Sequence, residues 1–298
     1  MTNAMIQELG NHVFDNHFHN VGPEPDDYML HYAPYASHVG ADSAVVMMDG
    51  MLAREEEGQL VLPKLRDYQT KPEYVYLFAI DDMRFFLALD VVVNVGDEFT
   101  YLGLNGCRFY TPRYLAFAAI TGYQLWDWHK HNRFCGACGT KLLHAPKSRE
   151  LVCPNCGMIV YPRINIGVII GITDGDKLLL TKYTGRSYTH YALVAGYTEV
   201  GETLEQTCER EIMEEVGLHV KDLTYFTDQP WSFSGTLLIG YFARLDGGSQ
   251  IKLDHHELAV AEWKTRSELP KTHEDTSSMT NYMIEAFAKG EDPFSQGR

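Results

Sequence analysis

Positive charge is scarce in this sequence. Its 298 residues include 25 lysines and arginines against 40 aspartates and glutamates, which gives a formal net charge of −15 at pH 7. Nucleic acids and anionic membranes attract proteins with an excess of basic residues. The composition therefore argues against non-specific binding to either of them. A phosphorylated substrate would have to be held by metal ions and by local cations.

Long apolar runs are also missing. No window approaches the roughly 20 apolar residues that a membrane-spanning helix needs. The first twenty residues lack the basic and apolar regions of a secretory signal peptide. We therefore expect a cytoplasmic protein that makes no use of a membrane. Because 45% of the residues are hydrophobic, a chain of this length can bury real cores, and we expect two or more domains.

Cysteines are few, but four of the six form a pattern. Cys135 and Cys138 make one Cys-x-x-Cys pair, and Cys153 and Cys156 make a second pair after fourteen intervening residues. Two such pairs at this separation are typical of one tetrahedral Zn²⁺. Two disulfides are the alternative, but thiols stay reduced in the expected cytoplasmic location. Four thiolates leave no open coordination position, so the sequence predicts one structural zinc ion per chain.

The most informative stretch runs from Gly196 to Leu218. Residues 203–216 contain no glycine or proline, and Gly217 stands where a helix would end. Two glycines, Gly196 and Gly201, let the preceding loop turn tightly. We therefore predict a tight loop followed by a helix over residues 203–216.

Acidic residues dominate one face of this predicted helix. Glu211, Glu214 and Glu215 share that face at 3.6 residues per turn, and Arg210 is the only cation in the helix. Carboxylate oxygens are the ligands that a hard divalent ion such as Mg²⁺ prefers. A solvated acidic face is the usual alternative for glutamate-rich stretches. The clustering nevertheless favours a metal-binding helix.

The spacing within this stretch resembles the Nudix box of diphosphate hydrolases. Gly196 is followed after five residues by Glu202, and after seven more by Arg-Glu-Ile-Met-Glu-Glu-Val-Gly-Leu, so every fixed position of the box is matched. The resemblance implies Mg²⁺ or Mn²⁺ as a catalytic cofactor. It implies four ligands for that metal, namely Ala195 (through its backbone carbonyl), Glu211, Glu215 and Glu257.

The residue types also predict a mechanism. A carboxylate accepts a proton from the water that attacks phosphorus, and Glu214 and Glu257 remain equal candidates for this base. Arg210 is expected to hold the glutamates through charge-assisted hydrogen bonds rather than to touch substrate. The predicted catalytic residues are Arg210, Glu211, Glu214, Glu215 and Glu257.

A zinc ribbon followed at once by a Nudix domain, with Gln229-Pro-Trp-Ser-Phe233 just after the box, resembles the NADH pyrophosphatase branch of the Nudix hydrolases. The resemblance covers residues from about 134 to 287. It implies a homodimeric enzyme that cleaves the diphosphate of NAD(H), a small-molecule dinucleotide, to nicotinamide mononucleotide and AMP. Some members of the family also remove NAD caps from RNA.

Substrate recognition is where the sequence departs from the family. The segment Asp228-Gln-Pro-Trp-Ser-Phe-Ser-Gly-Thr236 stands where the family usually has Ser-Gln-Pro-Trp-Pro-Phe-Pro-x-Ser. The lost prolines predict a less rigid loop. A Ser-Ile-Ala-like element near the C-terminus is likewise replaced by Ser278-Met-Thr280. The resemblance implies substrate contacts at Tyr161, Tyr197, Gln229, Pro230, Trp231, Ser232, Phe233, Ser234, Gly235 and Thr236.

Two other functions remain open. The nearer one keeps the chemistry and changes the substrate to ADP-ribose, a dinucleoside polyphosphate or NAD-capped RNA. The more distant one is a catalytically inactive Nudix domain that senses nucleotides, with the zinc ribbon as a protein-binding module. The intact set of box carboxylates argues against this second function, because sensing alone would not need all of them.

Secondary-structure patterns predict an α+β fold. Short β-prone runs before residue 110 indicate a small, mainly antiparallel sheet, in which the scattered His17, His19 and His31 are expected on the surface. Residues 112–131 read as a connecting helix. We predict a mainly-β N-terminal domain with this helix over residues 1–130 and a zinc ribbon over 131–160. A Nudix domain, built as a mixed β-sheet and α sandwich, is predicted over 161–298.

Overall fold

The computed structural model describes residues 9–39, 44–185, 190–270, 277–291 and 293–294. The chain divides into two compact units, one made of residues 6–163 with the short segment 232–234, the other made mainly of residues 164–231 and 235–298. The zinc ribbon is grouped with the N-terminal unit. The finer division into 1–130, 131–160 and 161–298 stays a prediction.

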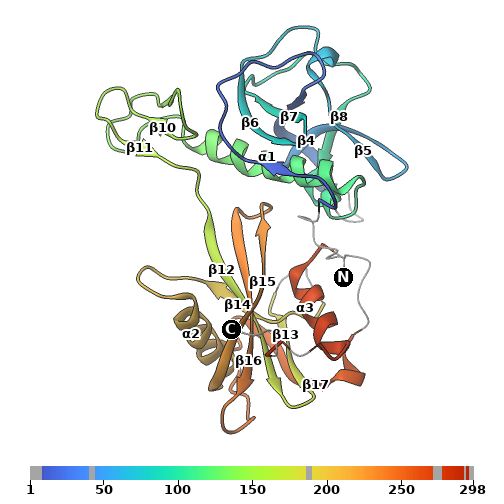
Figure 1. Cartoon of the computed structure of the whole chain (residues 1–298), viewed down its shortest axis with the longest axis vertical. Helices are drawn as coiled ribbons and strands as arrows, with labels where there is room; N and C mark the ends of the chain where they lie inside the picture. The colour runs from blue at the N-terminus through green and yellow to red at the C-terminus, as the bar shows by residue number, and fades with distance from the viewer. Residues whose placement is uncertain (1–8, 40–43, 186–189, 271–276, 292, 295–298) are drawn as a thin grey trace. The chain divides into compact units, whose positions relative to one another are not determined.

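Two small sheets make up most of the N-terminal unit (Figure 1). The first has the order β1 (Phe14–Asp15), β6 (Tyr74–Ile80), β7 (Met83–Ala88) and β2 (Tyr28–Leu30). The second has the order β3 (Tyr32–Val39), β4 (Ala44–Glu56) and β5 (Gln59–Val61), with β8 (Thr100–Gly103) also paired to β4. Every pairing is antiparallel except that of β2 with β7. The predicted mainly antiparallel N-terminal region is thus confirmed. Two short 3₁₀ helices, η1 (Leu65–Asp67) and η2 (Leu104–Arg108), complete it.

The predicted connecting helix is present as α1 (Arg113–His131). Its apolar side, which includes Leu115, Phe117 and Ile120, is buried. Gly122 allows the close approach of α1 to the first sheet, because a Cβ atom there would lie 2.4 Å from Cδ1 of Leu30.

One histidine departs from the expected surface position. His17 and His19 are exposed, whereas His31 is 2% exposed. Its Nε2 lies 2.8 Å from the carbonyl oxygen of Asp90, and its Nδ1 lies 2.8 Å from the hydroxyl of Tyr101. The surface prediction for His31 is therefore wrong. The reason is that both ring nitrogens have polar partners far away in sequence. Because these partners satisfy its hydrogen-bonding groups, the imidazole can be buried.

The zinc ribbon is a three-stranded sheet of β9 (Leu143–His144), β10 (Leu151–Val152) and β11 (Ile159–Val160). It packs on the C-terminal end of α1, where Trp128 joins Leu142, Leu151 and two of the ribbon cysteines in one apolar cluster. Arg149 of the ribbon also donates a 2.8 Å hydrogen bond to the side chain of Asn16. The ribbon is therefore fastened to its unit by both apolar and polar contacts.

The second unit is built on one mixed sheet. Its order is β15 (Val220–Trp231), β16 (Thr236–Leu245), β12 (Asn165–Asp174), β13 (Lys177–Tyr183) and β17 (Leu258–Thr265), with β14 (Val194–Tyr197) also paired to β12. Only β12 and β16 run parallel. A hairpin joins β12 to β13 around Asp174-Gly175-Asp176. A short 3₁₀ helix, η3 (Arg266–Glu268), follows β17.

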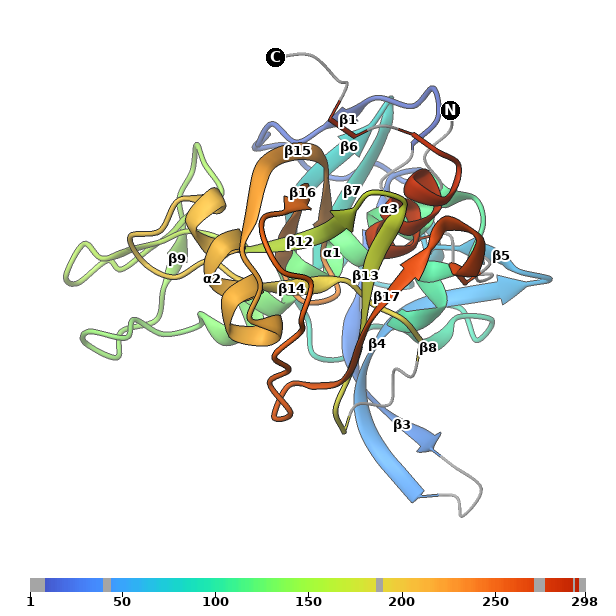
Figure 2. The same ribbon diagram turned by 90° about the horizontal axis from the view of Figure 1, so that it is seen from below.

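Two helices cover the opposite faces of this sheet (Figures 1 and 2). Alternate residues of β12 point to opposite faces, as in any strand. Val168, Ile170 and Ile172 pack in the cluster that contains the apolar stripe of α2 (Leu204–Val216). Ile169 packs in the cluster of α3 (Met279–Ala288). The layers confirm the predicted mixed sheet within an α sandwich.

Close packing in the centre of this sheet can be tested at Gly171. A Cβ atom there would lie 2.5 Å from Cε1 of Phe242, which is fully buried on the neighbouring strand β16. Because overpacking a core costs about 1–3 kcal/mol, we expect Gly171→Ala to lower the free energy of unfolding by about that amount in urea titrations. Gly248→Ala is the control, since nothing lies within 4 Å of its added methyl group. Equal midpoints for the two variants would contradict the tight contact between β12 and β16.

Candidate active site and zinc centre

The helix predicted over 203–216 is α2, and its two ends are fixed by local hydrogen bonds. At the start, the Thr203 hydroxyl accepts from the backbone N–H of Gln206, and the Gln206 side chain accepts from the N–H of Thr203. This reciprocal arrangement is a capping box. At the end, Gly217 adopts a φ of +65° and its N–H donates to the carbonyls of Ile212 and Met213. The sequence therefore sets the length of the helix that carries the acidic face.

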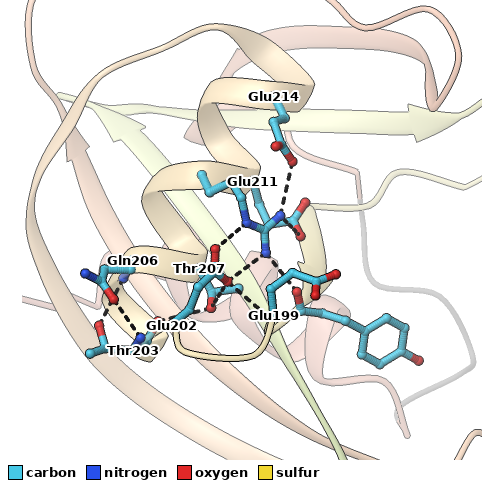
Figure 3. A network of polar contacts seen from close by, with 9 residues as sticks. Glu199, Glu202, Thr203, Gln206, Thr207, Glu211 and Glu214 are labelled. Carbon is cyan, nitrogen blue, oxygen red and sulfur yellow. Dashed lines mark hydrogen bonds and ion pairs between the residues drawn. The ribbon is translucent and has the colours of Figure 1, made fainter.

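Arg210 is the centre of a network of polar contacts on this helix. Figure 3 shows this network, with Glu202, Glu211 and Glu214 labelled. Its Nε and Nη2 donate to the two carboxylate oxygens of Glu202 at 2.6 and 2.9 Å. Its Nη1 donates to Glu211 at 2.7 Å and to Glu214 at 3.1 Å, and Nη2 also donates to the carbonyl of Tyr197 at 2.9 Å. One guanidinium thus contacts three carboxylates and the loop before the helix, as expected of a residue that holds the glutamates in place.

Glu202 is the member of this network that the sequence prediction missed. Besides Arg210, its carboxylate accepts from the Thr207 hydroxyl and from the backbone N–H of Glu199, both at 3.0 Å. The hydrogen bonds from Arg210 lower the pKa of Glu202 to about 2. The available signal was an acid just ahead of the helix, eight residues before its only arginine. That spacing is about two helical turns, which brings the two groups within reach.

The three glutamates of the acidic face differ in their surroundings. Glu211 and Glu215 are 8% and 2% exposed, whereas Glu214 is exposed. The Glu211 carboxylate lies directly against Gly196, since a Cβ atom at Gly196 would fall 2.0 Å from its Cδ. Burial raises the pKa of Glu211 although Arg210 acts in the opposite direction. A side chain at position 196 would therefore collide with the buried Glu211 carboxylate, so glycine is needed there for this contact as well as for the turn.

The remaining predicted metal ligands lie close to Glu211 and Glu215. Ala195 pairs with Ile169 of β12 and directly precedes Gly196. Glu257 is exposed, and its charge is among those that raise the pKa of Glu211. The segment before Glu257 is fixed to the end of α2, where the N–H of Asp254 donates to the carbonyl of Glu215 at 2.9 Å.

This donor set fits a hard divalent cation. Two acidic side chains, Glu211 and Glu215, are buried on one helix, where a bound cation would offset the cost of burying their charge. Their donors are all oxygens, which suits Mg²⁺ or Mn²⁺ and does not suit a soft metal. Ala195, Glu211, Glu215 and Glu257 would hold the ion.

The predicted substrate residues fall into both units. Tyr197 is 53% exposed at the end of β14, and its hydroxyl lies 3.2 Å from that of Thr236 at the start of β16. Trp231 is the last residue of β15 and pairs with Thr236 across the turn formed by residues 232–235. Tyr161 is exposed and belongs to the N-terminal unit. The structure therefore brings Tyr197, Trp231 and Thr236 to one end of the sheet.

Gln229 does not fit the predicted role as a substrate contact. Its side chain is fully buried, and its Nε2 donates to the carbonyl of Ser277 at 2.9 Å. The neighbouring Pro230 is exposed. The Gln229 side chain thus links strand β15 to the segment before α3.

The four predicted zinc ligands converge. Their sulfur atoms all lie within 4.8 Å of one another, and among the described residues no other group of three or more histidine, cysteine or acidic side chains is so close. Cys135 and Cys156 are 3.6 Å apart at Sγ, and Cys138 and Cys153 are 3.5 Å apart. Sulfurs on a tetrahedral Zn²⁺ are about 3.8 Å apart, given Zn–S bonds of about 2.3 Å. All four are free cysteines, so the disulfide alternative is wrong.

The two halves of the zinc centre repeat one backbone geometry. The N–H of Gly139 donates to the carbonyl of Cys135 at 2.8 Å, and the N–H of Gly157 donates to that of Cys153 at 3.0 Å. Both glycines have positive φ, +71° and +75°. Each Cys-x-x-Cys-Gly run therefore forms the same tight turn and presents two sulfurs to one point.

None of the helices in the described ranges is both long and apolar enough to cross a membrane.

Comparisons with known proteins agree with both centres. Residues 162–283 match the family described as NUDIX domain, and residues 130–161 match the family described as NADH pyrophosphatase zinc ribbon domain. The protein named NAD-capped RNA hydrolase NudC from Pectobacterium carotovorum subsp. carotovorum (strain PC1) is 37% identical over 150 residues, which is 50% of this chain and 57% of that protein. The protein of the same name from Escherichia coli O1:K1 / APEC is 37% identical over 149 residues, 50% of this chain and 58% of that protein.

The chain thus spans less than two thirds of the length of these relatives. Among solved structures, a NUDIX hydrolase from Nitrosomonas europaea is 20% identical, with a TM-score of 0.45 over 53% of this chain and 90% of that one.

The zinc centre can be tested by metal analysis. We expect protein purified without added zinc to contain close to one equivalent of zinc per chain, because the four thiols are already gathered at tetrahedral spacing. Cys153→Ser should lose most of this zinc. The control is Cys107→Ser, which changes a buried cysteine outside the zinc centre and should keep it. Metal-free wild-type protein with two disulfides would contradict the assignment.

Proposed function

We propose that this chain hydrolyses the diphosphate of NAD(H) to nicotinamide mononucleotide and AMP. The proposal is supported by the match of residues 162–283 to the NUDIX domain family and of residues 130–161 to the NADH pyrophosphatase zinc ribbon family. One observation carries the proposal: Arg210 holds Glu211 beside the buried Glu215, within a domain that directly follows the residues matched to the zinc ribbon. An inactive nucleotide sensor would have no need to bury two acids on one helix.

The catalytic cofactor we propose is Mg²⁺ or Mn²⁺, held by Ala195, Glu211, Glu215 and Glu257. When bound, such an ion neutralises charge on the diphosphate and lowers the pKa of a water molecule. The chain's own contribution is to hold the carboxylates in place. Arg210 fixes Glu211 by a 2.7 Å hydrogen bond, while Gly196 leaves room for the Glu211 carboxylate beside the backbone.

A base must still accept a proton from the attacking water, and the contacts favour Glu257 over Glu214. The Glu214 carboxylate already accepts a hydrogen bond from Arg210 at 3.1 Å and is thus part of the network that holds the helix and loop together. Glu257 is exposed and its carboxylate is not among the acids that Arg210 contacts. Glu257 is therefore proposed for two alternative roles, as a ligand of the metal ion or as the base that accepts the proton.

The second candidate substrate is NAD-capped RNA, because the relatives that match half of this chain are named as hydrolases of it. Both substrates contain the same diphosphate and the same nicotinamide end, so the chemistry at the box would not change. The net charge of −15 favours the small dinucleotide, since it weakens attraction of an RNA chain. A cytoplasmic location and a homodimer complete the proposal, and size-exclusion chromatography with light scattering would test the dimer.

The proposed chemistry is tested by Glu215→Gln with Mg²⁺ and a panel of NADH, NAD⁺, ADP-ribose and a dinucleoside polyphosphate. Loss of one charged ligand should lower kcat at least about a hundredfold while the shape of the side chain is kept. The fold should survive, because repulsion between the glutamates is relieved. Glu209→Gln, the same change on the exposed side of α2, should leave kcat unchanged. Equal activity of both variants would rule out the metal role of this face.

Substrate recognition is tested by Trp231→Ala. We expect the half-buried ring to stack on one base of the dinucleotide. Stacking contributes about 1–3 kcal/mol per base, so kcat/KM for NADH should fall roughly ten- to a hundredfold. A diphosphate substrate without the second base should lose much less. Tyr225→Ala, which removes an exposed ring from the same strand, is the control. Equal losses on both substrates would mean that Trp231 only supports the fold.

A further inference from the structure

A cavity of about 460 Å³ lies within the N-terminal unit. It is bordered by the C-terminal end of α1, by the zinc ribbon and by the strand ends around Asp90. Pockets that bind small molecules usually measure about 300–1,000 Å³. All of its lining residues belong to residues 6–163, so it shares none with the box, and the proposed hydrolysis makes no use of it.

The apolar walls of the cavity depend on the zinc centre. Leu142 and Leu151 line the cavity from the ribbon and belong to the same apolar cluster as Cys135 and Cys153. Trp126 lines it from α1 and is partly exposed. The zinc ligands therefore hold one wall, and a large aromatic ring is available on another. Such walls suit a flat, largely apolar group.

Two imidazoles lie side by side in this cavity. The rings of His129 and His144 have centroids 4.8 Å apart and come from α1 and from strand β9. Burial lowers the pKa of His129 to about 3, so this ring is neutral at pH 7, and partial burial also lowers the pKa of His144. A neutral imidazole offers one hydrogen-bond donor and one acceptor. Glu73 also lines the cavity and interacts electrostatically with His144, which adds an acceptor for an amino group.

Two neighbouring cations border the cavity. Arg133 and Lys141 lie on adjacent backbone segments, since the N–H of Leu142 donates to the carbonyl of Arg133 at 3.0 Å and Phe134 bridges to Lys141. Both are exposed, and within the described part of the chain neither forms an ion pair. A third cation, Lys130, is already paired with Asp49 at 3.0 Å.

Acidic residues are plentiful in a chain with a net charge of −15. Two adjacent cations that form no ion pair with any described acidic residue are therefore available to bind an anion. They can bind an anion at the border of a cavity whose interior suits a flat ring. Taken together, the cavity combines apolar walls, imidazole donors and acceptors, two acids (Glu73 and Asp90) and two available cations.

We propose that this cavity binds a nucleoside monophosphate whose base carries an amino group. The base lies among Trp126, His129 and His144, where Glu73 accepts from the amino group. The phosphate lies at Arg133 and Lys141. This is a binding site additional to the one for the substrate, and it requires no divalent cation.

The test measures AMP binding to the zinc-loaded protein without added Mg²⁺ or Mn²⁺, by isothermal titration calorimetry and hydrogen exchange. We expect AMP to protect backbone amides in segments 126–133 and 141–144. The double variant Arg133→Ser/Lys141→Ser should weaken AMP binding at least about tenfold but leave adenosine binding unchanged, since only the phosphate contact is lost. Lys147→Ser, an exposed cation of the ribbon that does not line the cavity, is the matched control.

Each other outcome overturns the proposal. Inorganic phosphate that displaces AMP at equal concentration would mean that the cations form a plain anion site. Protection confined to segment 196–216 would place AMP at the box instead. An affinity that the double variant shares with the control would remove the role of Arg133 and Lys141. Because NADH hydrolysis is measured separately with Mg²⁺, its failure and the failure of AMP binding are distinguishable.

Discussion

The hydrogen bonds of Arg210 are the interaction on which the candidate active site depends. Three carboxylates, from Glu202, Glu211 and Glu214, converge on one guanidinium, and charge-assisted hydrogen bonds of this kind are stronger than neutral ones. Without this cation the acids would repel one another along the helix. The same guanidinium also binds the carbonyl of Tyr197, which joins the loop to the helix. Metal binding, as proposed, needs this arrangement to exist beforehand.

The mixed sheet supports helix α2, which carries Arg210, Glu211 and Glu214. The apolar side of α2, through Cys208, Ile212 and Val216, packs on one face of β12, so the opposite side of the helix is directed away from the core. Glu211 and Glu215 lie at the border between the two sides, where they are buried yet still next to polar groups. A cation bound beside these carboxylates would offset the cost of burying their charge. The position of the acids thus follows from how α2 rests on the sheet.

The zinc ribbon and the N-terminal unit form a second, independent arrangement. The apolar cluster around the zinc ligands includes Trp128 of α1, so the metal centre stabilises the contact between ribbon and helix. That contact also forms one side of the cavity for which we propose a nucleotide. The ribbon would then serve the proposed function of this unit as well as its stability.

The features that the sequence determined by itself are local ones. The capped helix from Thr203 to Gly217, the doubled Cys-x-x-Cys turns and the match to the Nudix box all depend on residues close together in the chain, and the structure and comparisons confirm them. Tertiary structure alone decided the burial of His31, through partners 59 and 70 residues away. It also decided that the side chain of Gln229 is buried and hydrogen-bonded to Ser277, 48 residues away. Turns and helix caps are stabilised by neighbouring backbone groups, whereas burial depends on which distant segments pack together, and no local pattern contains that information.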